Sequence, residues 1–273
     1  MNSSEFIIPE KELGENEICV GLATTPEEKI GRLGVVTDRY IREGYLQGIP
    51  FAKVDLEARD VVEENGIGLL YDSLSEDLFD KFIKEGLLLR FSGGEQLYLD
   101  KYHWQSAQFV AKTRAGYVGS VRIIMYDEGS KLNLFKLPTL VEQDINIDSE
   151  WKEKANAVKA ELSQFAKTKE PYVPATVSIG LLRIAAQYSR ANNIDEWVAT
   201  TDNSVVKLLN GFMFNFDLPK IGPSVKYLGS ESTPVLINIE QAIGNAQKKG
   251  SSEDIARFLR GDDVKGFEWY TGV

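Results

Sequence analysis

The chain has 273 residues, of which 43% are hydrophobic and 10% aromatic, with 41 acidic against 31 basic residues and a formal net charge of −10. This length and composition suit one compact domain with a large core. The negative charge argues against nucleic acid or an anionic membrane surface as the main partner, because both would repel the protein. A single cysteine, Cys19, excludes an intramolecular disulfide and favours a reducing compartment.

Residues 1–17 are polar, and their start lacks the positive charge and long apolar stretch of a secretory signal. No run in the sequence approaches the roughly 18 apolar residues of a membrane span. We therefore expect a cytoplasmic protein without integral membrane association.

Two helix starts follow in the N-terminal third. Thr25-Pro26-Glu27-Glu28 combines a capping residue, a proline suited to the first turn and two acids that favour the positive end of the helix dipole. Ser73-Leu74-Ser75-Glu76 opens a second helix, which Gly86 ends. The apolar faces consist of Ile30, Leu33, Val36 and Tyr40 in the first helix and of Phe79, Phe82 and Ile83 in the second. We expect both helices to cover the side of a sheet where substrate enters.

A hairpin is predicted next, because residues 108–112 and 117–125 flank a short turn that ends at Gly116. The second of these strands is apolar on both faces and is expected to be central. Residues 131–148 mix apolar and acidic residues without a period, and a helix is expected around residues 151–159. A long connection of this kind between strands often forms a substrate-binding insertion.

The region from Ala160 to Pro223 predicts alternating strands and helices. A strand over residues 161–167 precedes a helix that ends at Asn192-Asn193, and residues 197–200 form a short buried strand. Asp202, Asn203 or Ser204 can cap the next helix, which Gly211 stops. This order suits a crossover connection on a mixed sheet. Two short helices are expected at residues 238–248 and 252–260.

Four motifs in this order resemble a known family. They are Gly119-Ser120-Val121-Arg122, Glu161-Leu162-Ser163-Gln164, Leu181-Leu182 and Gly222-Pro223. The sequence resembles the autoinducer (acyl-homoserine-lactone) synthases and the long-chain N-acyl amino acid synthases, which share the GCN5-related N-acetyltransferase (GNAT) fold. The resemblance covers roughly residues 18–240. One departure is Gln164, which stands where the family carries arginine and which cannot supply a positive charge.

The resemblance implies an α/β (α+β) fold with a mixed central sheet, flanked by helices in three α-β-α layers. We expect a polar N-terminal lead-in (1–17), a single acyltransferase domain (18–240) and a C-terminal helical extension (241–273). The implied chemistry is transfer of an acyl group from a thioester to an amine. An α-amine has a pKa of about 8 and must lose a proton before it attacks.

Glu161 is the candidate that positions or deprotonates this amine, because a carboxylate on a buried strand has a raised pKa. Arg122 lies among aliphatic residues and needs a counter-charge if buried. An ion pair between Glu161 and Arg122 without a catalytic role is an equally open interpretation. Strand alternation places Ser163 on the face of Glu161, where its hydroxyl can protonate the leaving thiolate or bond to backbone.

Other candidates lie on either side of the hairpin. Asp100 to Trp104 resembles a segment near the substrate amine in the family, which makes Asp100 a second candidate for amine binding. Trp104 can line an acyl tunnel or belong to the core. Arg39, with Arg32 and Tyr40, is the nearest equivalent of basic and aromatic residues that shape the family's site, or forms part of one ordinary helix. His103 is the only histidine, so no histidine pair can hold a metal and none is expected.

The acyl donor is inferred from a motif that is missing. Residues 167–181 contain no Gln/Arg-x-x-Gly-x-Gly/Ala loop, through which acetyl-coenzyme A-dependent members of the fold bind pyrophosphate. This favours an acyl carrier protein as donor over coenzyme A. The carrier is acidic and would need a local basic patch. The candidates are Lys167, Lys169, Arg183 and Arg190, which can also be ordinary solvated side chains.

The leading hypothesis is an N-acyltransferase that moves a medium or long fatty acyl chain from an acyl carrier protein to the amine of an amino acid or related metabolite, without a metal or redox cofactor. Homoserine-lactone synthesis from S-adenosylmethionine is less expected, because the tryptophan and paired acids of that branch are not recognisable between Tyr40 and Asp60. The alternatives are an acyl-CoA-dependent N-acetyltransferase of the same fold and a catalytically inactive acyl-carrier or lipid-binding module.

Overall fold

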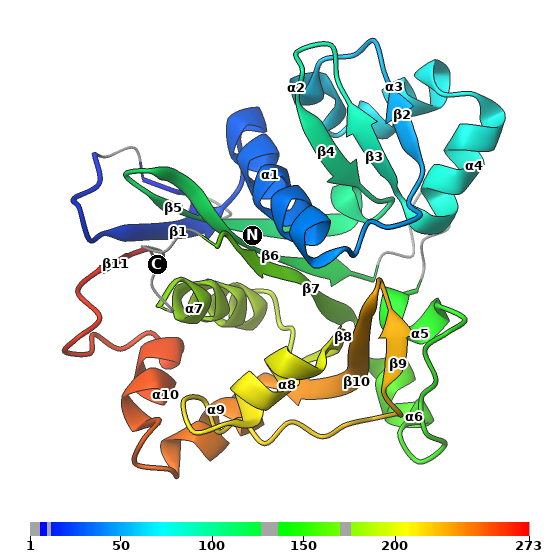
Figure 1. Cartoon of the computed structure of the whole chain (residues 1–273). Coiled ribbons are helices and arrows are strands. Elements are labelled where there is room, and N and C mark those ends of the chain that lie inside the picture. Colours follow the sequence, from blue (N-terminus) through cyan, green and yellow to red (C-terminus); the bar gives the residue numbers. More distant parts are fainter. Residues whose placement is uncertain (1–5, 10–11, 127–135, 170–175, 273) are drawn as a thin grey trace.

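The computed structural model describes residues 6–9, 12–126, 136–169 and 176–272. The described residues form an eight-stranded mixed sheet with helices on both faces and a separate three-stranded sheet (Figure 1). The strand order is β11-β1-β5-β6-β7-β8-β10-β9 in the large sheet and β2-β3-β4 in the small one. The large sheet confirms the predicted mixed α/β class. The small sheet was not predicted.

The strands of the large sheet are β1 (Ile18–Leu22), β5 (Ser106–Thr113), β6 (Gly116–Met125), β7 (Ala160–Lys167), β8 (Glu196–Asp202), β9 (Val225–Tyr227), β10 (Ser230–Asn238) and β11 (Tyr270–Thr271). The small sheet consists of β2 (Phe51–Lys53), β3 (Leu87–Arg90) and β4 (Gln96–Leu99). The helices are α1 (Pro26–Glu43), α2 (Ala58–Val61), α3 (Gly66–Ser73), α4 (Glu76–Glu85), α5 (Pro138–Val141), α6 (Lys152–Ala157), α7 (Thr176–Ala191), α8 (Asn203–Asn210), α9 (Ile239–Gln247) and α10 (Glu253–Arg260).

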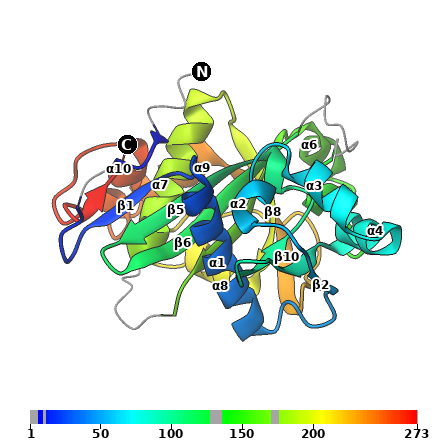
Figure 2. The ribbon, with the colours of Figure 1, turned by 90° about the horizontal axis from the view of Figure 1, so that it is seen from above.

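Neighbouring residues on β6 show how helices cover both faces of the large sheet. At Gly119 an added Cβ would lie 2.5 Å from Val177 of α7, so the missing side chain allows α7 to approach closely. The next residue, Ser120, faces the other way and accepts a hydrogen bond from Arg32 of α1 at 3.2 Å. Figure 1 shows α1 and α7 on opposite sides of the strands, and Figure 2 shows α2 to α4 grouped at one side of α1. The helix, sheet and helix layers match the three expected layers.

The predicted starts of α1 and α4 are confirmed. Thr25 and Glu28 form a reciprocal capping box, in which the Thr25 hydroxyl accepts from the Glu28 N–H at 3.2 Å and Glu28 Oε2 accepts from the Thr25 N–H at 3.0 Å. Gly86 ends α4 with a φ of +77°. However, Phe82 of α4 packs in the core of the small sheet. The expectation that α4 covers the main sheet is therefore wrong, since the small sheet takes its apolar face.

The second half of the chain follows the predicted order. α7 is followed by Asn193 in a left-handed conformation (φ +56°), and Asp202 caps α8 by accepting from the Ser204 N–H at 2.7 Å. The first part of the irregular segment predicted at residues 131–148 lies outside the described residues, and its later part contains α5. The strand β10, which pairs antiparallel to β8, was not predicted.

A β-bulge interrupts β7 at Gln164. Arg122 of β6 lies opposite Ser163, but Ser120 lies opposite Ala166, so β7 contains one extra residue at this point. Gln164 has a φ of +49°, the left-handed conformation typical of the first residue of some bulges. The bulge breaks the alternation of side chains along β7. As a result, Ser163 and Gln164 both point towards the face covered by α1.

Candidate active site

A cavity of about 270 Å³ lies where β7 and β8 meet. These strands are parallel, and Glu161 of β7 lies opposite Val198 of β8. Beyond this pair, residues of both strands line the cavity. Residues 161–165 of β7 and residues 199–202 of β8 line two of its sides. The cavity brings together Glu161, Ser163, Asp100, Arg122 and Arg39 of the predicted site residues.

Glu161 is a buried carboxyl that lines this cavity. The side chain is 4% exposed, and its Oε2 accepts a 2.8 Å hydrogen bond from the backbone N–H of Thr139, at the start of α5. Burial raises the pKa of Glu161 to about 8, although the hydrogen bonds from Thr139 and the charge of Arg122 act in the opposite direction. A carboxyl with this pKa exchanges protons near neutral pH, which is the property that a general base requires.

Arg122 pairs with Asp100, and the interpretation that it pairs with Glu161 is therefore wrong. Arg122 Nη1 donates to Asp100 Oδ1 at 2.7 Å, and Nη2 donates to Oδ2 at 2.6 Å. Burial opposes ionisation of Asp100, but the charge and hydrogen bonds of Arg122 outweigh it and lower the pKa of the carboxyl. Asp100 is thus a fixed anion that neutralises Arg122, and within the described part of the chain Glu161 has no cationic partner.

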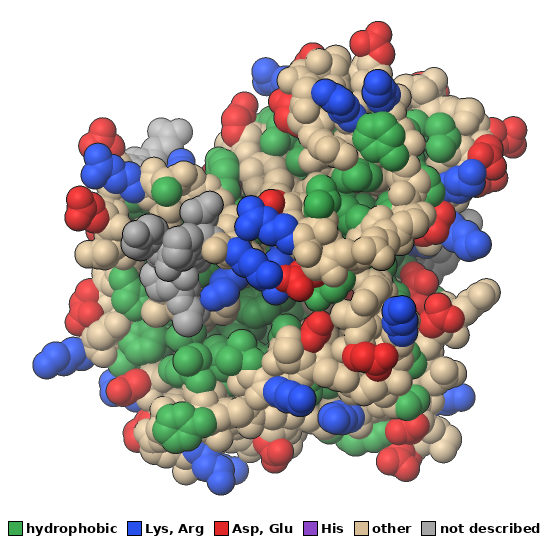
Figure 3. All heavy atoms as spheres, viewed as in Figure 1, with side chains coloured by type: hydrophobic (Ala, Val, Ile, Leu, Met, Phe, Trp, Pro, Cys, Tyr) green, Lys and Arg blue, Asp and Glu red, His purple; other side chains and the backbone are tan. Residues whose placement is uncertain are grey.

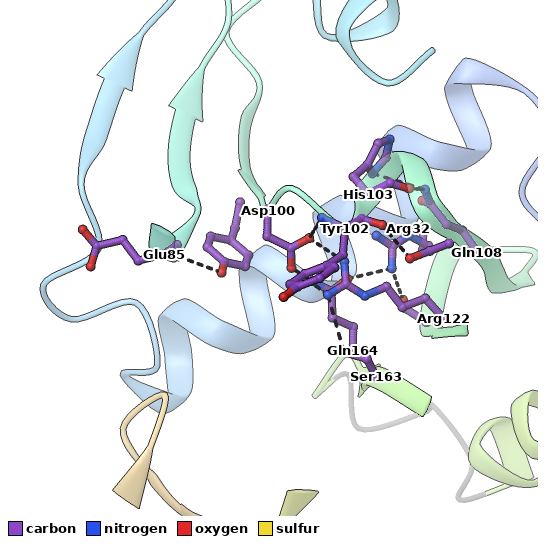
Figure 4. Close-up of polar contacts among 12 residues, drawn as sticks. Arg32, Glu85, Asp100, Tyr102, His103, Gln108, Arg122, Ser163 and Gln164 are labelled. Carbon is purple, nitrogen blue, oxygen red and sulfur yellow. Dashed lines mark hydrogen bonds and ion pairs between the residues drawn. The ribbon is translucent and has the colours of Figure 1, made fainter. Parts of the chain in front are cut away.

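Ser163 and Gln164 lie against this ion pair. Arg122 Nη2 lies 3.5 Å from the Ser163 hydroxyl, and the Gln164 amide nitrogen lies 3.4 Å from Asp100 Oδ2. Figure 4 shows Asp100, Arg122, Ser163 and Gln164 pointing towards one another. Glu161 and Ser163 both line the cavity, together with the intervening Leu162.

A buried arginine lies beneath the bulge. Arg32 is fully buried, and its Nη1 donates to the Gln164 side-chain oxygen at 2.9 Å as well as to Ser120. Burial and the charge of Arg122 lower the pKa of Arg32 to about 9. The neutral Gln164 side chain therefore connects Arg32 to the Asp100–Arg122 pair without adding a further charge.

Five tyrosines of the described chain line the cavity, and only the first of them, Tyr40, is among the residues predicted to shape the site. They are Tyr40, Tyr45, Tyr98, Tyr102 and Tyr227. They come from α1, the turn after it, β4, the segment before β5, and β9. Because these segments are far apart in the sequence, no local spacing brings the tyrosines together, and no sequence signal could have identified them as a group.

Basic side chains gather at the mouth of the cavity. Figure 3 shows Lys and Arg side chains beside a hollow lined with hydrophobic side chains. Arg39 lines the cavity and forms an ion pair with Glu43, whose Oε1 lies 3.2 Å from Arg39 Nη2. The same oxygen lies 2.9 Å from Lys169 Nζ, so Glu43 pairs with both cations. Lys167 is the last residue of β7. Two of the predicted carrier-binding lysines are therefore close to the end of the strand that lines the cavity.

Arg183, Trp104 and His103 lie elsewhere. Arg183 is 7% exposed, and its guanidinium donates to the carbonyls of Phe258, Gly261 and Asp262 at the end of α10. This is a packing position and not part of an exposed basic patch. The indole N–H of Trp104 donates to the carbonyls of Val61 and Glu63, so the ring supports the small sheet and does not line the cavity.

His103 is buried beside Trp104, where burial lowers its pKa to about 3. Its Nε2–H donates to the Val62 carbonyl at 3.1 Å, and its Nδ1 accepts from Gln108 at 3.2 Å. Over the described residues, no group of three or more His, Cys, Asp and Glu side chains has the geometry of a metal site. None of the helices in the described part of the chain is long and apolar enough to cross a membrane.

No family model matches the sequence, and no curated protein does so. The chain is similar to the solved structure of FeeM, an N-acyl amino acid synthase from uncultured soil microbes, with 12% identity and a TM-score of 0.48 over 84% of this chain and 94% of that chain. It is similar to the AHL synthase LasI, with 15% identity and a TM-score of 0.46 over 84% and 96% of the two chains. For BjaI, a CoA-dependent acyl-homoserine lactone synthase, the identity is 10% and the TM-score 0.42 over 94% of each chain. These are the classes of protein that the four sequence motifs resemble.

Proposed function

We propose that this chain is an N-acyltransferase that transfers a medium or long fatty acyl chain from an acyl carrier protein thioester to the amine of an amino acid or related metabolite. The observation that carries the proposal is Glu161, a buried carboxyl with a pKa of about 8 that lines a cavity and has no ion-pair partner among the described residues. A pKa of about 8 matches that of an α-amine and makes this proton transfer almost balanced in energy, whereas an alkyl ammonium with a pKa of about 10.4 loses its proton to Glu161 at a cost of about 3 kcal/mol.

The reaction can be written with these residues. Glu161 takes one proton from the bound ammonium, and the neutral nitrogen attacks the thioester carbonyl carbon. The C–S bond then breaks, and its electron pair goes to sulfur. The second nitrogen proton reaches the thiolate, for which the Ser163 hydroxyl in the same cavity is the candidate relay. The products are an amide, a free thiol and the proton held by Glu161.

The strands β7 and β8 suit a thioester that arrives on a long flexible arm. Glu161 and Val198 are the one register pair described between these strands, and residues of both strands further along line the cavity. An extended arm with amide groups can bond to the backbone edge of a strand as an added strand does. Lys167 is the last residue of β7, and Lys169 follows two residues later. Both carry the positive charge that would attract an acidic carrier protein.

The proposal is tested by thiol release. The purified protein is mixed with a panel of acyl carrier protein and coenzyme A thioesters, with amino acids and other amines added in separate reactions, and products are identified by mass spectrometry. We expect amine-dependent release from the carrier protein thioester, with an N-acyl product. Thiol release from the coenzyme A thioesters alone would identify coenzyme A, and not the acyl carrier protein, as the donor.

A matched variant separates catalysis from binding. Glu161→Gln keeps the size of the side chain and an oxygen that can accept from Thr139, so the fold and carrier binding should survive while release is lost. If the unmodified protein binds the acyl carrier protein but releases no thiol with any amine, the protein is a binding module and the proposed activity is wrong.

A further inference from the structure

The interior of the cavity combines aromatic rings with carboxyls. Tyr40 is in ring contact with Tyr45 and Tyr98, with centroids 5.5 Å and 5.8 Å apart. Burial raises the pKa of Tyr40 to about 12 and that of Tyr98 well above 10, so these phenols stay neutral at physiological pH. The face of a phenol ring attracts ammonium groups. Lys101 of this chain already places its Nζ 5.2 Å from the centre of the Tyr102 ring.

Two of the four cationic side chains that line the cavity in the described chain take part in ion pairs. Arg122 is held by Asp100 through two hydrogen bonds, and Arg39 is paired with Glu43. Of the two lysines that line the cavity, Lys84 is exposed on α4 beside Glu85, and the charge of Lys101 acts on Glu142, half-buried after α5. In the described chain, five carboxyls line the cavity against four cationic side chains, and Glu161 and Asp202 take part in no ion pair.

Glu161 and Asp202 each retain capacity for a ligand. Among the described residues, Thr139 is the only hydrogen-bond partner of Glu161, through its backbone N–H to Oε2 and through its side chain. Asp202 accepts from the Ser204 N–H at 2.7 Å and from the Tyr45 hydroxyl at 3.1 Å, and it takes part in no ion pair within the described chain. The two carboxyls come from neighbouring strands, β7 and β8, on the wall of one cavity.

The register gives their separation. Glu161 lies opposite Val198, and Asp202 is four residues further along β8. At about 3.3 Å per residue, the two positions are roughly 13 Å apart along the sheet. A linear polyamine carries its ammonium groups along a chain of comparable length, so one amine can lie at Glu161 while a distal ammonium lies at Asp202 and Tyr45.

From this arrangement we propose that the acceptor is a linear diamine or polyamine without a carboxylate. The inference rests on the acyltransferase function proposed above and narrows its acceptor. The carboxylate of an amino acid would lie among Glu142, Glu161 and Asp202 and find the cavity's guanidinium groups already paired. Burying a carboxylate without a cationic partner is strongly unfavourable. A second ammonium gains an interaction with Asp202 instead.

The test compares acceptors that differ only by a carboxylate. With one carrier protein thioester at fixed concentration, kcat/KM is measured for 1,5-diaminopentane against lysine, for 1,4-diaminobutane against ornithine, and for a linear triamine. We expect each diamine to exceed its amino acid by about 100-fold or more, and the triamine to have the lowest KM. A lysine or ornithine rate equal to or above that of the matched diamine overturns the inference and leaves the acyltransferase proposal standing. No thiol release with any amine overturns both.

The variant Asp202→Asn tests the distal contact. Asparagine still accepts from Ser204 and Tyr45 and is a good helix cap, so α8 should keep its start. We expect its KM for the triamine to rise by about tenfold, the change that the loss of about 1.4 kcal/mol produces, with little change for a monoamine of similar length. The control is Glu231→Gln, an exposed carboxylate on β10 outside the cavity. An equal change in KM for the triamine and the monoamine would show that Asp202 does not bind the distal ammonium, and would overturn this contact.

Discussion

The backbone N–H of Thr139 donates a hydrogen bond to Oε2 of Glu161 at 2.8 Å. This bond connects the start of α5 to β7 beside the cavity. The bond and the charge of Arg122 favour the carboxylate, whereas burial disfavours it, and burial prevails to give a pKa of about 8. The carboxyl is consequently held in one orientation and is protonated for part of the time at neutral pH.

The first prediction concerns the pH dependence of the rate. If Glu161 is the general base, kcat of the unmodified enzyme should rise with pH and level off above about pH 8, where the carboxylate predominates. Glu161→Gln should be at least about 100-fold slower and lack this titration. The measurement is thiol release under saturating substrates from pH 6 to pH 9. A Gln variant that keeps the same pH profile would assign the titration to another group.

The second prediction concerns stability. The pKa of Glu161 rises from 4.5 to about 8 on folding, so between these pH values the folded state binds more protons than the unfolded state and stability falls as pH rises. At about 1.4 kcal/mol per unit, the full effect is at most about 5 kcal/mol. Glu161→Gln has no such titration. Its free energy of unfolding should therefore increase relative to that of the unmodified protein between pH 5 and pH 8. Urea denaturation measures this difference, and the exposed Glu153→Gln on α6 should show none.

The third prediction separates a buried ion pair from an exposed one. Asp100→Asn leaves Arg122 buried without its counter-charge, and we expect a loss of about 3–5 kcal/mol of unfolding free energy. Asp77→Asn, which removes the partner of Lys81 on the surface of α4, should leave the free energy of unfolding almost unchanged, because water and salt screen an exposed pair. Adding Arg122→Met to Asp100→Asn should recover part of the loss. Equal losses in the two single variants would show that the buried pair has no special role.

Local signals in the sequence were sufficient for individual elements. The Thr25 capping box, the glycine that ends α4 and the left-handed Asn193 act within one turn of helix, so the residues themselves identify them. That Glu161 and Ser163 share one face of β7 remains a prediction from strand alternation, because residues 161–165 all line the cavity. The small sheet was missed because its strands are only three or four residues long.

Interactions between distant segments could not be predicted in the same way. Asp100 and Arg122 meet because β4 and β6 belong to different sheets that come together at the cavity, and no periodicity records this contact. The bulge at Gln164 is a further example. Strict alternation would place the Gln164 side chain on the face of β7 opposite to that of Ser163. The extra residue in the register instead directs the Gln164 side chain towards Arg32.

The fourth prediction concerns the charge at Gln164. Gln164→Arg would place a second guanidinium beside Arg32, which already lacks a direct acidic partner among the described residues, and we expect a loss of about 2–4 kcal/mol of stability. Gln164→Glu supplies Arg32 with a counter-charge and should be closer to neutral. The double variant Arg32→Gln with Gln164→Arg should recover stability relative to Gln164→Arg alone. Thermal and urea unfolding of the unmodified protein, Arg32→Gln, Gln164→Arg and the double variant measure this coupling, and additive effects would contradict it.

The last prediction distinguishes packing from carrier docking among the basic residues. Arg183→Met removes hydrogen bonds to three carbonyls around the end of α10 and should cost about 2–4 kcal/mol of stability, with no change in KM for the carrier protein thioester in the folded fraction. Lys167→Glu with Lys169→Glu should instead raise that KM at least about tenfold at low salt and little at high salt, because the attraction between exposed charges is screened. The same pair of substitutions should leave the KM for a short pantetheine thioester unchanged, since this donor has no protein surface to dock. A KM that rises equally for both donors would place the lysines in contact with the arm and not with the carrier.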